Sequence, residues 1–297
     1  MVVGNDAMDI PACWRKMAVA VRNLGRSGVS SMAISAVDTA LWDLKARLLG
    51  LPLVTLLGAA RARVPLYGSG GFTSYSEARL CAQLSAWAEQ GFPHVKMKIG
   101  RDPVADRSRV RLARLAIGPS VELFVDANGA YGRKQAIAQA DAFTSSRVSW
   151  LEEPVSSDDL EGLRSIRERA PSGMDIAAAE YGYNLGYFRR MLEANAVDVL
   201  QADASRCGGI TGFLQVAALC EARSLRLSGH CAPALHAHVA CSVPAVCHLE
   251  YFHDHARVEE MLFDGVLAPK GGALEPDCSR PGMGLTLKTS EAARLAI

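Results

Sequence analysis

Residues 148–154 read Val-Ser-Trp-Leu-Glu-Glu-Pro, a short apolar segment closed by two acids and a proline. Similar apolar segments closed by a carboxylate stand before it at Val121–Asp126 and after it at Asp175–Glu180. An amphipathic stretch with helical spacing follows each segment, and strands that alternate with helices indicate a parallel sheet. This repeated unit predicts an α/β fold.

The same unit extends outward in both directions from residues 148–154. The expected strands are Val64–Ser69, His94–Ile99, Val121–Asp126, Val148–Glu152, Asp175–Glu180, Val197–Asp203, Arg226–His230 and Val246–Tyr251. The expected helices between them are Ser74–Gln90, Asp102–Ile117, Arg133–Ser145, Leu160–Ala170, Leu185–Ala194, Ile210–Arg223 and Leu235–Ser242. Eight parallel strands are the number that closes a TIM-like barrel.

The N-terminal residues 1–60 have a different pattern. Apolar residues repeat at helical spacing over Ser31–Leu49, and Gly50 and Pro52 then end the predicted helix. Met17–Leu24 predicts a second helix, and no strand hairpin is expected before it.

The composition bounds the class of protein. Of 297 residues, 49% are hydrophobic and 21% charged, and the formal net charge is +1. A sizeable core is expected, and no basic excess points to nucleic acid or to an anionic membrane. The eight cysteines form no Cys-x-x-Cys pair, which favours reduced thiols in a cytoplasmic protein. We expect neither a signal peptide nor a membrane-spanning segment.

Three carboxylates, Asp126, Glu152 and Glu180, close three successive expected strands. The carboxyl ends of parallel barrel strands meet at one rim, so these side chains should converge. Clustered carboxylates repel one another unless a cation neutralises them, and hard oxygen ligands favour Mg²⁺, with Mn²⁺ as second choice. One such acid alone would more often cap a helix or pair with an arginine. Three at successive strand ends predict a metal site.

Two lysines precede the acids by one βα unit, in Lys96-Met97-Lys98. Residues i and i+2 of a strand point to the same face, so both ammonium groups should enter the barrel mouth. A neighbouring cation lowers a lysine pKa, which would let Lys98 act as a base. Lys-x-Lys by itself would equally suit a solvated strand. The prediction that Lys98 is a base therefore depends on the position of the two lysines one βα unit before the acids.

The later strands end in further ionisable groups. Asp203 and His230 close neighbouring expected strands, and an aspartate beside an imidazole stabilises its protonated form. His230 is therefore a candidate second acid or base. Glu250 closes the last strand, where a carboxyl group kept protonated could donate a hydrogen bond to a developing oxyanion. A salt bridge at the rim is the structural alternative for Glu250.

The order of these motifs resembles that of the enolase superfamily, mandelate racemase subgroup, over roughly residues 31–290. The motifs are Lys-x-Lys, Asp-Ala-Asn, Trp-Leu-Glu-Glu-Pro, Glu, Gln-Ala-Asp with Gly208-Gly209-Ile210-Thr211, His and Glu. The resemblance implies Mg²⁺ on Asp126, Glu152 and Glu180, with Glu153 beside the ligand Glu152.

The resemblance also implies roles for the remaining site residues. Lys98 would be the base on one face of the substrate, with Lys96 lowering its pKa. His230, held by Asp203, would act on the other face. Glu250 would stabilise the enediolate, an intermediate that enolase-superfamily sites are known to form.

The fold implied is a (β/α)7β barrel with a capping domain from both chain ends. Relatives carry a longer N-terminal region, so we expect an N-terminally truncated α+β capping domain. The expected division is a partial cap over 1–60, the barrel over 61–255 and a C-terminal segment over 256–297 that returns to the cap. Barrels of this type commonly associate, so a homo-oligomer is expected.

The predicted function is Mg²⁺-dependent abstraction of the proton α to a carboxylate in a small-molecule substrate. Many relatives dehydrate sugar acids, which favours a sugar-acid dehydratase. Two groups on opposite faces would equally permit a racemase or epimerase of an α-hydroxy acid. A relative that has kept the metal site without catalysis is a third possibility.

Two histidine pairs, His236-Ala-His238 and His253-Asp-His255, leave a zinc hydrolase as an alternative. The first pair falls within an expected helix, where residues i and i+2 do not share a face. The second lies beyond the last strand. Tyr183 and Arg206 are candidates for holding distal polar groups, and the glycines of 68–71 suggest close approach of a ligand.

Overall fold

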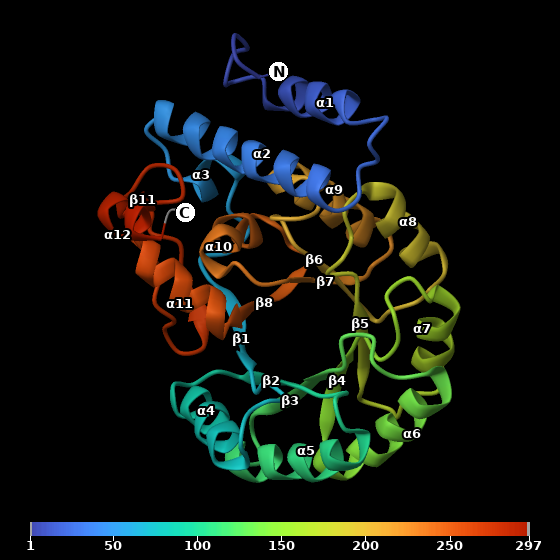
Figure 1. Ribbon diagram of the computed structural model, residues 1–297. Helices are drawn as coiled ribbons and strands as arrows, with labels where there is room; N and C mark the ends of the chain where they lie inside the picture. Colours follow the sequence, from blue (N-terminus) through green and yellow to red (C-terminus); the bar gives the residue numbers. More distant parts are fainter. Residues whose placement is uncertain (1, 296–297) are drawn as a thin grey trace.

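Eight parallel strands pair in chain order from β1 to β8, and β1 also pairs with β8, which closes the sheet into a barrel. The computed structural model describes residues 2–295 and shows the helices wrapped around this barrel (Figure 1). The predicted α/β barrel is confirmed. The strands are β1 (Val64–Gly70), β2 (His94–Lys98), β3 (Glu122–Asp126), β4 (Val148–Glu152), β5 (Asp175–Ala178), β6 (Val199–Ala202), β7 (Arg226–Gly229) and β8 (Val246–Phe252).

Helices lie between the strands close to where the periodicity placed them. They are α4 (Glu77–Glu89), α5 (Pro103–Ile117), α6 (Arg133–Phe143), α7 (Leu160–Arg167), α8 (Leu185–Glu193), α9 (Gly209–Ala222) and α10 (Pro233–Ser242), with a 3-10 turn at Thr144–Ser146. Side-chain caps begin several of them, as at α5, where Asp102 accepts from the amides of Val104 and Ala105.

Three helices precede the barrel: α1 (Ile10–Ala20), α2 (Val29–Leu48) and α3 (Leu53–Leu57). The expected helix at Ser31–Leu49 is confirmed in α2, whereas the expectation for Met17–Leu24 is wrong in its bounds. Pro11 stands in the first turn of α1, where a proline is favoured, so the helix begins well before Met17. It ends at Ala20, and turns continue toward Gly25. Within residues 2–295 no strand precedes β1.

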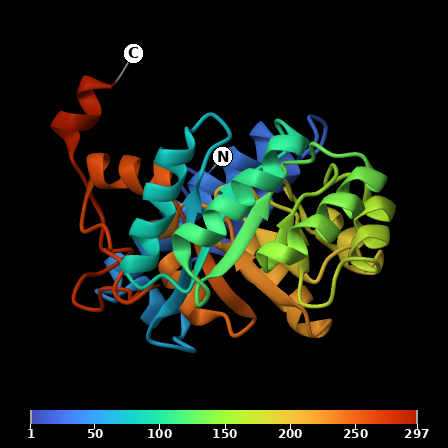
Figure 2. The same ribbon diagram turned by 90° about the horizontal axis from the view of Figure 1, so that it is seen from below.

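The C-terminal segment runs along the barrel and returns toward α2 and α3. It contains α11 (His253–Leu262), β9 (Phe263–Asp264), β10 (Ala273–Leu274), β11 (Thr286–Leu287) and α12 (Thr289–Arg294). Strand β10 pairs antiparallel with the start of β1, and the amide of Met283 donates to Asp43 of α2. Helix α12 projects away from the barrel (Figure 2). The domain boundaries near residues 60 and 255 stay a prediction.

The barrel interior is filled below the rim by an aromatic layer. Tyr67, Phe124 and Trp150 are buried there, and Phe124 stacks on Trp150 with ring centroids 5.0 Å apart. His248 packs its edge against Tyr67 at 4.9 Å. This layer is a solid floor, so the polar residues above it have one open direction, toward the mouth of the barrel.

One buried carboxylate joins α2 to the barrel. Asp38 accepts hydrogen bonds from the amide of Thr211 at 2.9 Å and from its hydroxyl at 2.7 Å, at the start of α9. Gly209, with φ of 80°, leaves the space that Asp38 fills, because a Cβ there would lie 2.2 Å from the carboxylate. Burial raises the pKa of Asp38 to about 6, although both hydrogen bonds from Thr211 oppose the shift.

This carboxylate predicts a pH effect on stability. A carboxyl whose pKa is raised in the folded state contributes its full stability below the unfolded pKa, and loses it as pH rises through the folded value near 6. Between about pH 4 and about pH 7, wild type should lose about 1–3 kcal/mol of unfolding free energy relative to Asp38→Asn. Urea unfolding of both proteins across this range measures the difference. A difference that does not change with pH would contradict the assignment.

No helix among residues 2–295 has the length and apolar character needed to cross a membrane.

Candidate active site

The strand register sets three of the expected site residues side by side. Lys98 of β2 is the register partner of Asp126 in β3, and Asp126 is the partner of Glu152 in β4. Partners in a parallel sheet point the same way, so these side chains form a row across the rim. All three lie at the last position of their strands.

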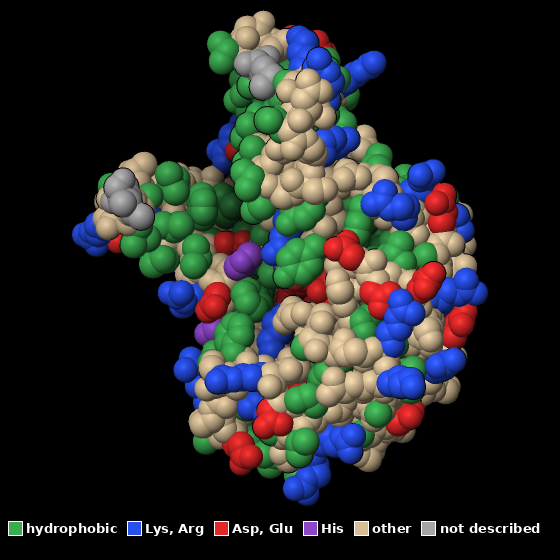
Figure 3. All heavy atoms as spheres, turned by 45° about the vertical axis from the view of Figure 1, so that its right-hand side comes forward, with side chains coloured by type: hydrophobic (Ala, Val, Ile, Leu, Met, Phe, Trp, Pro, Cys, Tyr) green, Lys and Arg blue, Asp and Glu red, His purple; other side chains and the backbone are tan. Residues whose placement is uncertain are grey.

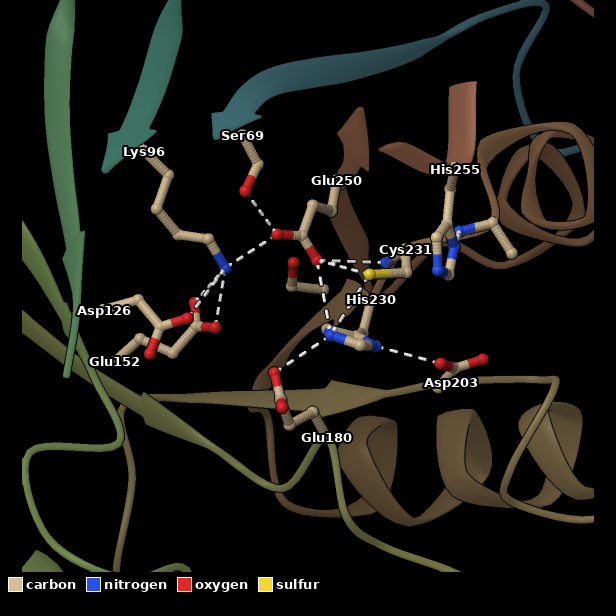
Figure 4. Close-up of polar contacts among 12 residues, drawn as sticks. Ser69, Lys96, Asp126, Glu152, Glu180, Asp203, His230, Cys231, Glu250 and His255 are labelled. Atoms are coloured by element: carbon tan, nitrogen blue, oxygen red, sulfur yellow. Dashed lines mark hydrogen bonds and ion pairs between the residues drawn. The ribbon is translucent and has the colours of Figure 1, made fainter. Parts of the chain in front are cut away.

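The remaining residues come from the other half of the barrel. Glu180, Asp203 and His230 follow the ends of β5, β6 and β7 by one or two residues, while Glu250 lies within β8. Figure 4 shows Lys96, Asp126 and Glu152 on one side, His230 and Asp203 on the other, and Glu180 and Glu250 between them. The convergence expected from the strand ends is present in the structure.

The backbone around this rim is strained. Non-glycine residues take positive φ next to site residues: Glu153 at 38°, Ala179 at 100° and Cys231 at 52°. Each conformation costs of order 1–3 kcal/mol and persists only where the surroundings impose it. Such residues cluster at ligand-binding and catalytic sites, and here they aim Glu152, Glu180 and His230 into the mouth.

Lys96 is fully buried at the centre of the acids. Its Nζ lies 2.6 Å from Oε1 of Glu152, 2.9 Å from Oε1 of Glu250 and 3.7 Å from Oδ2 of Asp126. Burial alone would lower the pKa of Lys96, but Glu152 and Glu250 outweigh burial and raise it well above its usual range. Lys96 is therefore a fixed cation that links the two sides of the site.

Lys98 is ion-paired with Asp126 and keeps 16% of its side chain exposed. The expectation that its pKa is depressed is wrong in this arrangement. Burial lowers the pKa and Lys96 lowers it further, but the attraction of Asp126 outweighs both and leaves it above the usual value. The carboxylate responsible is one of the candidate metal ligands, so a bound cation would compete with Lys98 for it.

His230 and Asp203 form the expected pair. Nδ1 of His230 lies 2.9 Å from Oδ2 of Asp203, and Nε2 lies 2.9 Å from Oε2 of Glu180. Burial would lower the pKa of His230, but Glu180 and then other acids raise it well above its usual range. The imidazole is thus a cation poised to give up a proton from Nε2 toward the mouth.

Glu250 is not the protonated donor expected from the sequence. Its Oε1 accepts from Ser69 Oγ at 2.6 Å and pairs with Lys96, while Oε2 accepts from the amide of Cys231 at 3.0 Å. Burial would raise the pKa of Glu250, but Lys96 and His230 outweigh burial and hold it well below its usual range. The residue is a carboxylate surrounded by donors.

Sequence reasoning missed Ser69 and Cys231. Ser69 stands near the end of β1, the one expected strand without an ionisable end residue, and its position on the rim was the available signal. Cys231 directly follows His230, and its thiol lies 3.3 Å from Nε2 of that residue. Nothing in the sequence pattern distinguishes it from the other buried cysteines.

The three carboxylates suit a hard divalent cation. Oxygen atoms of Asp126, Glu152 and Glu180 lie within 4.8 Å of one another, and all three residues are buried. Burial raises the pKa of Glu152 above its usual range, and repulsion by the nearby carboxylate of Asp126 raises it further. A cation bound by these oxygens would relieve that repulsion.

The histidines of the zinc alternative are used elsewhere. Nε2 of His236 accepts from the amide of Ala204 at 2.9 Å, and Nδ1 of His238 accepts from that of Val54 at 3.2 Å. Nδ1 of His255 accepts from the amide of Ala232 at 3.0 Å. These rings therefore fix loops around the site and form no metal cluster among the described residues.

Of the other residues expected to contact a ligand, Tyr183 and Arg206 lie near the rim, whereas the glycines of 68–71 serve packing. Tyr183 lines a pocket of about 590 Å³ at the rim, together with Asn128, Tyr181 and Arg190. Arg206 donates to the carbonyl of Glu180 at 3.1 Å and lies over the Tyr181 ring. The glycines of 68–71 are explained by packing instead: a Cβ at Gly68 would lie 2.5 Å from the Trp87 ring.

A barrel whose rim sets a carboxylate cluster between a lysine and a histidine is the arrangement of an enolase-type enzyme. The family model for enolase C-terminal domain-like proteins matches residues 79–292. The model for the mandelate racemase/muconate lactonizing enzyme N-terminal domain matches residues 1–58. The chain belongs to the mandelate racemase/muconate lactonizing enzyme family of the enolase superfamily.

Three relatives show which members of this family the chain is similar to. A mandelate racemase/muconate lactonizing enzyme-like structure from Rubrobacter xylanophilus is 58% identical with a TM-score of 0.96, over 98% of this chain and 81% of that one. The 3,6-anhydro-alpha-L-galactonate cycloisomerase of Streptomyces coelicolor is 36% identical over 100% of this chain and 81% of its own. L-Talarate dehydratase from Polaromonas sp. JS666, solved with Mg and L-glucarate, is 36% identical with a TM-score of 0.89, over 98% and 80%.

These relatives confirm the predicted class of enzyme, a lyase or isomerase of this superfamily. The cofactor prediction is confirmed as well: magnesium is bound in the talarate dehydratase structure, and this chain carries a buried cluster of three carboxylates that could hold a metal ion.

Proposed function

We propose that this chain is a sugar-acid dehydratase that removes the proton α to the carboxylate of an aldonate or aldarate. The observation that carries the proposal is the placement of two cationic acid–base groups on opposite sides of one carboxylate cluster. Lys98 stands beside Asp126, and His230 stands beside Glu180. Asp126, Glu152 and Glu180 would hold Mg²⁺, which when bound neutralises charge that develops on the substrate carboxylate.

The chain's own residues divide the proton transfers. Lys98 must first leave Asp126 and lose its ammonium proton to the solvent, and its neutral Nζ then accepts the α-proton. Buried Lys96 holds positive charge where the enediolate forms. His230 carries a proton at Nε2 and gives it to the departing β-hydroxyl, which leaves as water. Asp203 fixes the tautomer of His230 through Nδ1. Glu250 positions Lys96 and the loop that carries Cys231.

The rim pocket supports a polyhydroxylated substrate. Its lining combines hydroxyl and amide side chains, Tyr181, Tyr183, Asn128 and Ser157, with the cation of Arg190. Such groups suit the alternating donors and acceptors of a sugar chain, and Arg190 suits a second carboxylate. The pocket lies beside Glu153, next to the proposed metal ligand Glu152.

A screen tests the function directly. The protein is incubated in D₂O with Mg²⁺ and a library of aldonates and aldarates, and mass spectrometry follows deuterium uptake and loss of water. We expect one group of acid sugars to lose water, and EDTA to abolish the reaction until Mg²⁺ is restored. Exchange without loss of water would instead indicate a racemase or epimerase. If no acid sugar exchanges its α-proton, the chain is a metal-binding relative without this activity.

Location and assembly are proposed on separate grounds. All eight cysteines are free, which supports a cytoplasmic protein. Hydrophobic side chains gather on the N-terminal part of the chain that projects from the barrel (Figure 3). In α2, Val29 is 82% and Met32 44% exposed. Apolar patches of this kind commonly mark interfaces, which supports a homo-oligomer. Light scattering of the purified protein gives its mass in solution.

A further inference from the structure

We propose that His230, Cys231 and Glu250 form a second metal site, one that takes a thiol-seeking divalent cation such as Zn²⁺. All three side chains are buried and supply one ligand atom each. Sγ of Cys231 lies 3.3 Å from Nε2 of His230 and 3.4 Å from Oε2 of Glu250, and those two atoms are 3.5 Å apart. The cluster shares no residue with Asp126, Glu152 and Glu180.

The spacing of these atoms is that of a tetrahedral zinc site. Zinc binds sulfur at about 2.3 Å and nitrogen or oxygen at about 2.0–2.1 Å, so its ligand atoms lie roughly 3.3–3.6 Å apart. The three separations, 3.3, 3.4 and 3.5 Å, need almost no adjustment. The fourth position would be left for water or substrate.

The surrounding contacts aim the ligand atoms toward one another. Nδ1 of His230 is held by Asp203 at 2.9 Å, the carboxylate–histidine arrangement that supports metal-bound imidazole. Oε1 of Glu250 is occupied by Ser69 and Lys96, which leaves Oε2 facing the thiol. The amide of Cys231 donates to that same Oε2 at 3.0 Å and fixes the cysteine beside it. Each ligand is thus oriented before any metal arrives (Figure 4).

The ligand types separate the two sites chemically. Thiolate and imidazole favour zinc and similar ions, whereas Mg²⁺ prefers a set of oxygen ligands. Binding would release the thiol proton of Cys231 and the Nε2 proton of His230, and both go to the solvent. If the proposed function is correct, zinc here removes the proton donor without displacing Mg²⁺ and so inhibits the enzyme.

Cadmium reports on thiolate binding independently of turnover. The full chain, held in excess Mg²⁺, is titrated with Cd²⁺ while the thiolate-to-cadmium absorption band in the ultraviolet is followed. We expect one tightly bound Cd²⁺ per chain, with at least about a tenfold loss of affinity in Cys231→Ser and Cys231→Ala. Cys220→Ser, which alters a buried cysteine of α9, should bind as wild type does. No tight band in wild type, or an equal band in both Cys231 variants, would overturn the site.

Zinc inhibition is measured on the same variants once a substrate is known. Zn²⁺ should inhibit wild type and Cys220→Ser at concentrations that more Mg²⁺ does not reverse. Each Cys231 variant, compared with its own zinc-free rate, should require at least about tenfold more Zn²⁺. Inhibition that Mg²⁺ reverses would place zinc on the three carboxylates and contradict the second site. The cadmium titration needs no catalysis, so a wrong proposed function would leave its outcome unchanged.

Discussion

Replacing Lys98 with methionine is expected to lower the rate of α-proton exchange and of dehydration together, by about 10²–10⁴-fold. Methionine keeps the length and apolar stem of the side chain but cannot accept a proton. The side chain reaches Asp126 at the rim and keeps 16% of its surface exposed, so a substrate carbon can approach its Nζ. Deuterium uptake from D₂O and loss of water are measured on the same samples.

Lys134→Met is the matched control, because it removes an exposed lysine from α6. Its rates and its unfolding midpoint should match wild type. If Lys98→Met keeps proton exchange within about tenfold of wild type while remaining folded, Lys98 is not the base.

Replacing His230 with asparagine is expected to separate the two activities. Loss of water should fall by about 10²–10⁴-fold, because the departing hydroxyl loses its proton donor. Exchange of the α-proton should persist, since Lys98 and the carboxylate row on β2, β3 and β4 are untouched. The measurement is deuterium incorporated into recovered substrate, compared with product formed.

Asp203→Asn is a milder variant that tests the same proton donor. It removes the carboxylate charge that faces Nδ1 of His230 but leaves the imidazole in place, so a smaller fraction of His230 carries the proton that it donates. Dehydration should fall less than in His230→Asn and should shift toward lower pH. A loss of proton exchange equal to the loss of dehydration in His230→Asn would show instead that His230 is the base, as expected of a racemase acting on the opposite face.

Much of the fold could be predicted because its signals are local. The apolar segments and helical spacing between residues 64 and 252 placed the strands and helices within a few residues. The bounds of α1 were missed, because a short helix is decided by its caps and packing rather than by periodicity. The convergence of Asp126, Glu152 and Glu180 followed from a single topological rule, that parallel strand ends meet at one rim.

The protonation states could not be predicted in the same way. Glu250 was expected to be a neutral donor because burial raises the pKa of a carboxyl group. Lys98 was expected to have a lowered pKa because a neighbouring cation lowers the pKa of a lysine. In the structure Lys96 lies 2.9 Å from Glu250, and Asp126 contacts Lys98, and these contacts reverse both signs. A pKa depends on distances of a few ångströms between strands far apart in sequence, which no spacing along the chain encodes.

The sequence by itself determined the barrel, the family motifs and the identity of the residues at the rim. Their order along the chain was enough, since each side chain needed only to stand at the end of its own strand. Only the tertiary structure decided how they pair. Lys96 lies between Glu152 and Glu250, and His230 lies between Asp203 and Glu180. Cys231 contacts both His230 and Glu250. The physical reason is that closing the sheet through β1 and β8 sets Ser69, Cys231 and Glu250 against one another. Those contacts arise from closure and from a left-handed turn at Cys231, and neither is written in local sequence.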